Sequence, residues 1–188
     1  MHIFTMRPDG SDPRPVTTGV PAGGATWVAP QWAPSGLRIA ASIIDDNAYL
    51  LEPTAAGGWR QVTLPRVEAA NEAFRPGAWF RDERRIAGVT DRSRQLVVYD
   101  VDRRTYDETG LRGFEPDRGV AWLPGGQRLL LIRAGTIVLV DLASREASTV
   151  FDPPAQQAIT GFSLTSDGRR LFYILVANES DIALMKLK

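Results

Sequence analysis

The chain has 188 residues, 44% of them hydrophobic, and its 22 Lys and Arg residues balance 22 Asp and Glu residues. A chain of this length buries roughly 70% of its unfolded surface, so it can fold as one domain without metals or disulfides. Zero net charge provides no global field to hold nucleic acid or an anionic membrane, and the absence of cysteine excludes disulfides, Cys-ligated zinc and thiol catalysis. Pro, Asp and Arg interrupt residues 1–20, which therefore resemble neither a signal peptide nor a spanning segment, and we expect no membrane insertion.

Four similar frames follow one another along the chain, each with a bulky apolar anchor, a tight turn, an arginine and an aliphatic run. The anchors are Trp32, Trp79, Trp122 and Leu164, which lie 47, 43 and 42 residues apart. Pro34-Ser35-Gly36, Gly125-Gly126 and Asp167-Gly168 supply the turn, whereas Glu83 stands at the turn-glycine position of the second frame. A fixed period in the forties, built from short strands, is typical of β-propeller blades.

Each frame also has the pattern of a four-stranded antiparallel unit. The first apolar runs cover residues 39–44, 86–90, 129–132 and 171–176, and the second runs cover 49–51, 96–99, 137–140 and 182–185. Weaker outer segments follow, such as 59–64 and 147–151. The runs are short and separated by Gly, Asp, Asn and Ser, which favours strands over helices. We therefore expect an all-β chain of propeller blades.

The residues that recur in each frame have expected structural roles. The anchors are predicted to lie on the inner strand of each blade and to pack between neighbouring blades, where an aromatic side chain buries about 150 to 250 Å². The arginines at the common offset are Arg38, Arg85, Arg128 and Arg170. We expect them to hydrogen-bond turn carbonyls or to pair with an acid of the neighbouring blade. Ligand stacking by the anchors and partner contact by the arginines are the alternatives.

The frames resemble the WD40-like (PD40) propeller repeat of the TolB family, whose signature is an aromatic residue followed by Ser-Pro-Asp-Gly-Lys/Arg and an aliphatic strand. Residues 3–17 are similar to the family's third strand, hairpin and fourth strand, and residues 181–187 fit the third-strand position. The resemblance implies one β-propeller-type domain over 1–188. Its parts are a half-blade at 1–25, blades at about 26–72, 73–116 and 117–158, and an incomplete last blade at 159–188.

These expected parts do not make a closed ring by themselves. A TolB-like propeller of six or more blades needs roughly 250 residues at this period. We therefore expect the C-terminal part of a longer propeller, located outside the cytoplasm if the whole is a secreted TolB-like protein. The alternative is a small or open propeller that closes by self-association with a second copy through exposed blade edges.

The residues offer little for catalysis. His2 is the only histidine, and the chain has no nucleophile elbow, phosphate-binding loop or dinucleotide fingerprint, so we expect neither an enzyme nor a cofactor. Asp45, Asp46 and Asn47 form the one acidic cluster with possible calcium-ligand chemistry, and a hairpin turn is the favoured interpretation. Asn178 begins a formal glycosylation site that also fits a turn.

Two classes of function remain. In the first, the loops after the second strands and between blades share one face, which binds a protein or peptide partner, as the TolB resemblance implies. Arg92, Arg94 and Arg133 lie on these loops and are predicted to favour an acidic peptide, with solvated arginine as the alternative. Asp45, Asp46 and Asn178 are further candidate binding residues on the same loops. In the second class, the chain is the accessory propeller of a larger hydrolase or receptor kinase.

Overall fold

The computed structural model of the chain describes residues 2–17, 26–44, 46–69, 71–165 and 167–177. Within these ranges the regular structure consists of sixteen strands without a helix. Three four-stranded sheets contain β3 (Trp27–Trp32), β4 (Ile39–Ile43), β5 (Ala48–Pro53) and β6 (Trp59–Thr63); β7 (Phe74–Trp79), β8 (Arg85–Thr90), β9 (Leu96–Asp100) and β10 (Thr105–Glu108); and β11 (Val120–Trp122), β12 (Arg128–Arg133), β13 (Thr136–Asp141) and β14 (Glu146–Phe151). Two-stranded sheets contain β1 (Phe4–Thr5) with β2 (Arg14–Pro15) and β15 (Gln157–Leu164) with β16 (Leu171–Ala177).

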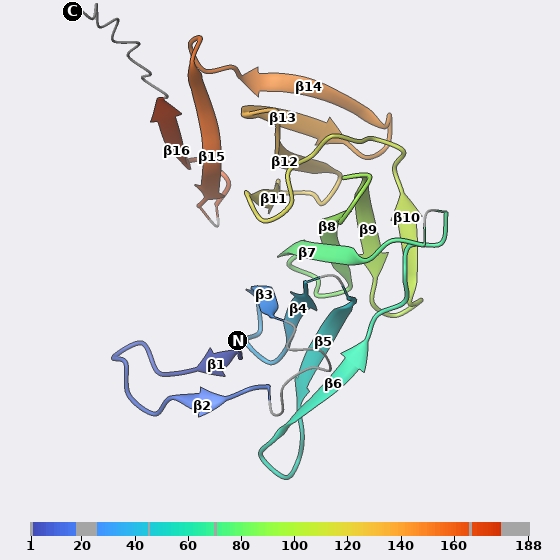
Figure 1. Cartoon of the computed structure of the whole chain (residues 1–188), viewed down its shortest axis with the longest axis vertical. Helices are drawn as coiled ribbons and strands as arrows, with labels where there is room; N and C mark the ends of the chain where they lie inside the picture. Colours follow the sequence, from blue (N-terminus) through green and yellow to red (C-terminus); the bar gives the residue numbers. More distant parts are fainter. Residues whose placement is uncertain (1, 18–25, 45, 70, 166, 178–188) are drawn as a thin grey trace, which may run out of the picture.

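Every sheet is an antiparallel meander in which consecutive strands pair. The sheets follow one another around an open arc, with β3, β7, β11 and β15 on the concave side and β6, β10 and β14 on the rim (Figure 1). This is the arrangement of propeller blades, so the predicted all-β blades are confirmed. The predicted strand at 182–185 lies outside the described residues.

The core consists of the layers between successive sheets. Ala40 and Leu50 of one sheet pack with Phe74 and Ile86 of the next, and three similar clusters join the other neighbouring sheets. Because both faces of a middle blade are covered, its second strand is buried almost throughout, as β4 and β8 are. This explains why these strands are continuous apolar runs rather than alternating ones.

The turn that follows each anchor uses the left-handed region at one fixed position. Gly36, Gly126 and Gly168 have φ of 72°, 67° and 70°, and Glu83 has φ of 57° at the matching place. The Glu83 carboxylate accepts hydrogen bonds from the Ser35 amide and, at 3.0 Å, from the Ser35 hydroxyl of the preceding blade. These contacts between blades offset the strain of a non-glycine residue in this conformation.

The inner strands are irregular at corresponding places. The register between first and second strands shifts between Val28 and Gln31, between Pro76 and Ala78, and between Ile159 and Gly161. These β-bulges place Ala29, Gly77 and Thr160 outside the regular ladder. A bulge leaves the extra residue unpaired and bends its strand, so three blades present irregular backbone toward the concave side of the arc.

Candidate binding face

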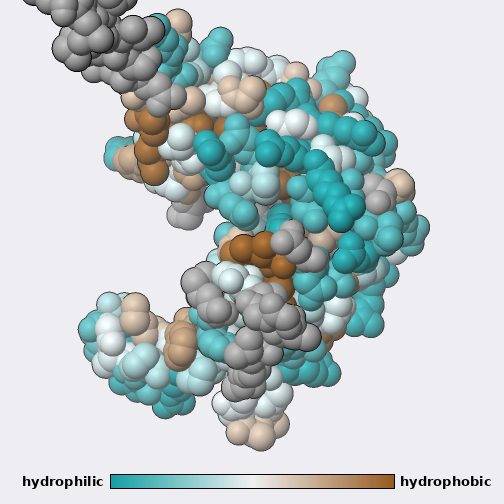
Figure 2. Space-filling model, in the orientation of Figure 1, coloured by the Kyte–Doolittle hydropathy of each residue, from teal (hydrophilic) through white to brown (hydrophobic). Residues whose placement is uncertain are grey.

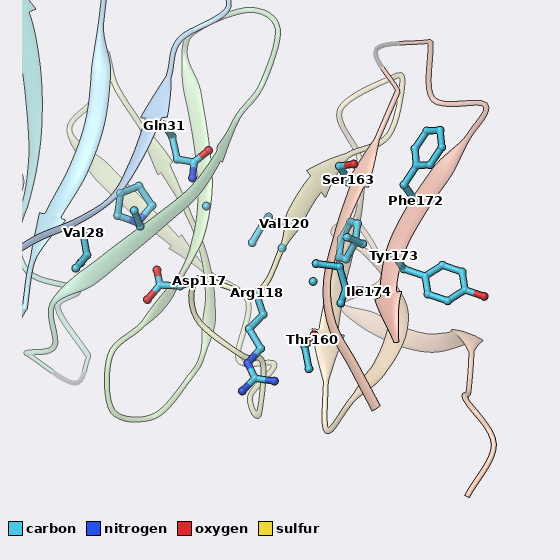
Figure 3. Close-up of a pocket in the computed structure, with 16 residues that line it drawn as sticks. Val28, Gln31, Asp117, Arg118, Val120, Thr160, Ser163, Phe172, Tyr173 and Ile174 are labelled. Carbon is cyan, nitrogen blue, oxygen red and sulfur yellow. The ribbon is translucent and has the colours of Figure 1, made fainter. Parts of the chain in front are cut away.

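A pocket of about 840 Å³ lies on the concave side, where the inner strands of four sheets converge (Figure 3). All three bulge residues, Ala29, Gly77 and Thr160, belong to its lining. Bulges are common beside functional sites because they turn strand backbone toward a ligand. The pocket therefore has backbone groups that the sheet ladders do not use.

The wall of the pocket is mainly apolar and its ends are polar. Val28, Val120 and Ile174 contribute aliphatic surface. Asp117, Arg118 and Thr160 lie toward one end in Figure 3, and Gln31 and Ser163 lie toward the other. An apolar cavity with a few placed polar groups is the usual chemistry of a site that binds an organic ligand or a peptide.

Close backbone approaches fix the shape of this pocket. A Cβ atom on Gly77 would lie 2.4 Å from the Val120 side chain, and one on Gly119 would lie 2.8 Å from Phe162. Gly119 also has φ of 130°, a conformation that other residues rarely adopt. Glycine is therefore required at both places for neighbouring blades to approach one another.

The arginine loops predicted from the sequence meet through Phe114. The Phe114 amide donates to the Arg94 carbonyl at 3.2 Å, and the Arg133 guanidinium lies over the Phe114 ring at 4.4 Å. Arg92 and Arg94 are exposed, whereas Arg133 is half-buried. Asp117, which lies three residues after Phe114 in the same loop, is part of the pocket lining. The structure therefore brings the loops of Arg94 and Arg133 together at Phe114 and places them beside the pocket.

Glu72 holds the loop that contains Arg92. It is buried, and its Oε2 accepts hydrogen bonds from the Ser93 amide at 2.9 Å, the Ser93 hydroxyl at 3.0 Å and the Arg92 amide at 3.3 Å. Burial acts to raise the pKa of the Glu72 carboxyl, but these hydrogen bonds and one involving Thr90 outweigh it and lower the pKa below its ordinary value. The ionised carboxylate is thus a fixed part of the loop.

The other candidate residues are arranged as turns or are not described. The Tyr49 hydroxyl donates to Asp46 Oδ2 at 2.8 Å, and burial together with this contact raises the pKa of Tyr49 to about 12. Asp45 and Asn178 lie outside the described residues. Among the described residues, no group of three or more His, Asp or Glu side chains could hold a metal ion. No helix in the same part of the chain has the length and apolar character needed to cross a bilayer.

Two anchors form a repeated contact between blades. The indole N–H of Trp79 donates to the Gln31 carbonyl at 3.0 Å, and that of Trp122 donates to the Ala78 carbonyl at 3.1 Å. Gln31 and Ala78 each immediately precede the anchor of the previous blade. Each indole is therefore tied to the same backbone position of its neighbour, and these two anchors pack between blades as predicted.

The predicted arginines complete the same contact. Arg38 lies over the Trp79 ring at 5.0 Å and donates to the Glu83 carbonyl at 3.0 Å. Arg85 lies over the Trp122 ring at 5.2 Å and donates to the Gly126 carbonyl at 2.8 Å. Glu83 and Gly126 both stand four residues after the anchor. We call this set of a tryptophan, two carbonyls and an arginine the inter-blade joint.

Trp32 differs from the expectation for the anchors. It lies on the inner strand β3, but it is 49% exposed and contacts Trp59 of its own sheet, with ring centroids 6.1 Å apart. Within the described part of the chain, no inner strands lie on the outward side of Trp32, so the joint has no second half there. Leu164 is half-buried and contributes to the cluster between β12 and β15, without an indole to form a joint.

The sequence did not reveal the pocket. Ala29, Gly77 and Thr160 share no residue type and follow no motif, so their common position emerges only from the strand registers. Figure 2 shows that the arc is hollowed on its concave side and that hydrophobic surface gathers there. Phe172 and Ile174 on β16 contribute to this surface and are 59% and 62% exposed.

Comparisons with known proteins identify the fold. No protein-family model and no curated protein sequence matches the chain. Among solved structures, a protein assigned as TolB from Agrobacterium tumefaciens is similar with a TM-score of 0.62 and 16% identity, over 86% of this chain and 57% of that one. The β-propeller domain of Cps50 (Swd1) from Myceliophteria thermophila is similar with a TM-score of 0.57 and 13% identity, over 79% of this chain and 53% of that one. The chain thus spans somewhat more than half the length of these structures, and its fold is that of a β-propeller with TolB-like and WD40-like neighbours.

Proposed function

We propose that the chain is a non-catalytic scaffold that binds an extended segment of a partner protein in the concave pocket. The pocket itself is the observation that carries the proposal, because bulges from three different blades open on one cavity of about 840 Å³. Ligand sites in proteins commonly have volumes of roughly 300 to 1,000 Å³. Unpaired backbone groups at the bulges can bind a peptide main chain, while Val28, Val120 and Ile174 accept its apolar side chains.

The arginine loops indicate which charge the partner segment carries. Arg92 and Arg94 project from the loop that Glu72 fixes, and stacking on Phe114 holds the Arg133 guanidinium. A guanidinium binds a carboxylate through two parallel hydrogen bonds, and prior ordering lowers the entropy that binding costs. The preferred partner segment is therefore acidic on the side that lies against these loops.

Selection from a random peptide library displayed on phage tests the pocket. Peptides enriched on the unmodified protein are measured by fluorescence anisotropy against Thr160→Trp, which fills the cavity from a bulge. Thr149→Trp on the exposed face of β14 is the matched control. We expect at least about tenfold weaker binding for Thr160→Trp, roughly 1.4 kcal/mol, and no change for Thr149→Trp. Equal binding by both variants would show that the peptides do not bind in the pocket.

A second arm tests the arginines with the same peptides. The triple variant Arg92→Ala, Arg94→Ala and Arg133→Ala is compared with Arg60→Ala, Arg84→Ala and Arg103→Ala, which removes the same charge from the start of β6 and from two turns at the other end of the blades. We expect the first variant to bind acidic peptides about three- to tenfold more weakly, because exposed ion pairs each contribute up to about 1 kcal/mol. The same loss in both variants would show that only total charge matters.

A further inference from the structure

The two ends of the arc each present one open half of an inter-blade joint. At one end, Trp32 has an exposed ring, and its indole N–H makes no hydrogen bond to any described residue. The Gly36 carbonyl stands four residues after it, at the place where Glu83 and Gly126 accept from an arginine in the two formed joints. This end therefore carries the tryptophan and the turn carbonyl of a joint, but no arginine.

The opposite end of the arc carries the complementary groups. Ser163 immediately precedes the anchor Leu164, as Gln31 and Ala78 precede theirs, and Arg170 stands at the offset of Arg38 and Arg85. Both Ser163 and Arg170 are exposed. Among the described residues, the Arg170 guanidinium has no hydrogen-bond acceptor or acid as its partner. This end offers the strand carbonyl and the arginine, and lacks the indole.

The two ends of the arc also match in the part of a blade that they present. One end leaves the inner half of a sheet uncovered, and the other end consists of inner strands. Ile3 and Val16, which adjoin β1 and β2, pack on the cluster around Trp27 and Ile39, so this hairpin covers part of the outward face of the first complete sheet. Trp32 remains uncovered on the inner strand of that sheet. The sheet β15–β16 consists of the two inner strands of its frame. The β15–β16 sheet of a second copy therefore has the size needed to cover the inner half of the β3–β6 sheet around Trp32.

Arg128 shows that an exposed arginine alone does not indicate a missing partner. It occupies the same offset and is exposed, because the next anchor is Leu164, which has no ring to receive a guanidinium. The face beside Arg128 is already covered, since β15 packs on β12 and β13 through Ile132 and Ile159. Arg170 stands on a sheet that no further described sheet covers, and Phe172, Ile174 and Val176 of that sheet are exposed.

We infer that the chain self-associates head to tail, with Trp32 of one copy completing a joint with Ser163 and Arg170 of a second copy. The Trp32 indole donates to the Ser163 carbonyl, and Arg170 stacks on the Trp32 ring and donates to the Gly36 carbonyl. This repeats the chemistry of the two joints within the chain and buries apolar surface of β16. Phe172 and Ile174 also line the pocket, so the two proposals share part of β16. Association is measured without a peptide and peptide binding on the monomer, so each proposal can fail without the other.

Sedimentation velocity over a wide range of concentrations tests the association. The unmodified chain is expected to move from 20.6 kDa toward twice that mass as concentration rises. Trp32→Ala and Arg170→Ala are each expected to weaken association about thirtyfold, the effect of truncating a central interface residue. Val150→Ala on exposed β14 and Arg169→Ala beside Arg170 are the matched controls and should leave association unchanged. Circular dichroism melting shows whether each variant remains folded.

Mixing the two defective variants gives the sharpest test. Trp32→Ala retains a sound Arg170 end, and Arg170→Ala retains a sound Trp32 end, so an equimolar mixture can form one intact joint. We expect a two-chain complex in the mixture that neither variant forms alone. Failure of the mixture to associate, or a monomeric unmodified chain at every concentration, would overturn the inference.

A chain that ends at Ala177 separates this interface from any contribution of residues 178–188. Those residues include the run 182–185, which the sequence predicts as a strand beside β16, whereas Trp32, Ser163, Arg170 and the exposed side chains of β16 all remain in the shortened chain. The shortened chain is therefore expected to associate as the full chain does. Loss of association on shortening would assign it to the tail and sink the proposal.

Discussion

Glu83 occupies a turn position that glycine holds in the three other frames. Its φ of 57° is unfavourable for a side chain with a Cβ atom, yet the carboxylate reaches Ser35 and the Arg38 guanidinium of the preceding blade. Burial acts to raise the pKa of Glu83, but its bonds to Ser35 and Arg38 outweigh burial and lower the pKa. The charged contacts of Glu83 with the preceding blade thus offset the strain of its backbone conformation.

Glu72 provides the residue-scale prediction, which concerns pH. Because its pKa is lower in the folded protein than the ordinary 4.5, its ionised form stabilises the fold above that value, and this contribution disappears as the pH falls through the folded pKa. Glu72→Gln is expected to lower the free energy of unfolding by about 1 to 2 kcal/mol at neutral pH. The difference from the unmodified protein should vanish in acid, as measured by urea denaturation across the pH range.

Glu146→Gln is the control for this measurement. Glu146 lies exposed on β14 and makes no side-chain hydrogen bond to any described residue, so its substitution should not change the pH profile. A pH-independent loss in Glu72→Gln would contradict the assigned role of charge and leave only a packing effect.

At the scale of the element, the inter-blade joint explains why a blade needs both a tryptophan on its first strand and an arginine on its second. The tryptophan reaches backward to the carbonyl before the previous anchor, and the arginine reaches forward over the next tryptophan. The sheet β7–β10 is thereby joined to both neighbours through groups at fixed sequence offsets. This is a physical reason for the near-constant period of the repeat.

Trp79→Phe tests the joint. The substitution removes the indole N–H, leaves the half-buried Gln31 carbonyl without its donor and reduces the ring beneath Arg38. We expect a loss of about 1 to 3 kcal/mol in the free energy of unfolding, measured by urea denaturation. Trp32→Phe makes the same chemical change where the joint is open, and it should cost less than about 0.5 kcal/mol in the monomer. Equal losses in the two variants would show that the indole hydrogen bond is not the cause.

At the scale of the whole molecule, the arc is a row of sheets in which each contacts only its neighbours. Stability in such a row is close to a sum of blade and interface contributions. Joints strengthen two interfaces between complete sheets, whereas the interface between the last two sheets has no joint and relies on apolar packing around Ile132, Ile137 and Ile159 and on the contact of Phe151 with Tyr173. The interfaces are therefore unequal, and local opening should begin at the weaker one.

Hydrogen exchange measured by mass spectrometry tests this order of opening. At a concentration where the chain is monomeric, amides of β15 and β16 are expected to exchange faster than those of β8 and β9, which have a joint on either side. The Trp32→Ala variant keeps self-association from protecting β16 during the measurement. Uniform protection across the four strands would show that the molecule opens only as a unit.

The sequence predicted the strands and the joint groups but not how they would be used. Trp79 and Trp122 were recognisable because their frames repeat, and short apolar runs separated by turn residues identified the strands around them. The exposure of Trp32 was not predictable, because it depends on which sheets lie beside it and not on its own frame. The stacking of Arg133 on Phe114 joins segments that lie on separate elements, and the bulges at Ala29, Gly77 and Thr160 follow strand registers that no local pattern encodes.

The joint has a consequence for how such a chain can change in evolution. A sheet that is cut out with its own tryptophan and arginine keeps a complete connector on either side, because each group acts at a fixed distance from its neighbour's backbone. Duplicating the segment 74–119 would therefore preserve the tryptophan and arginine contacts of both joints. Gene duplication could lengthen the molecule by whole sheets that keep these connectors, although Glu83 of the added sheet would face Asp82 where Glu83 now contacts Ser35.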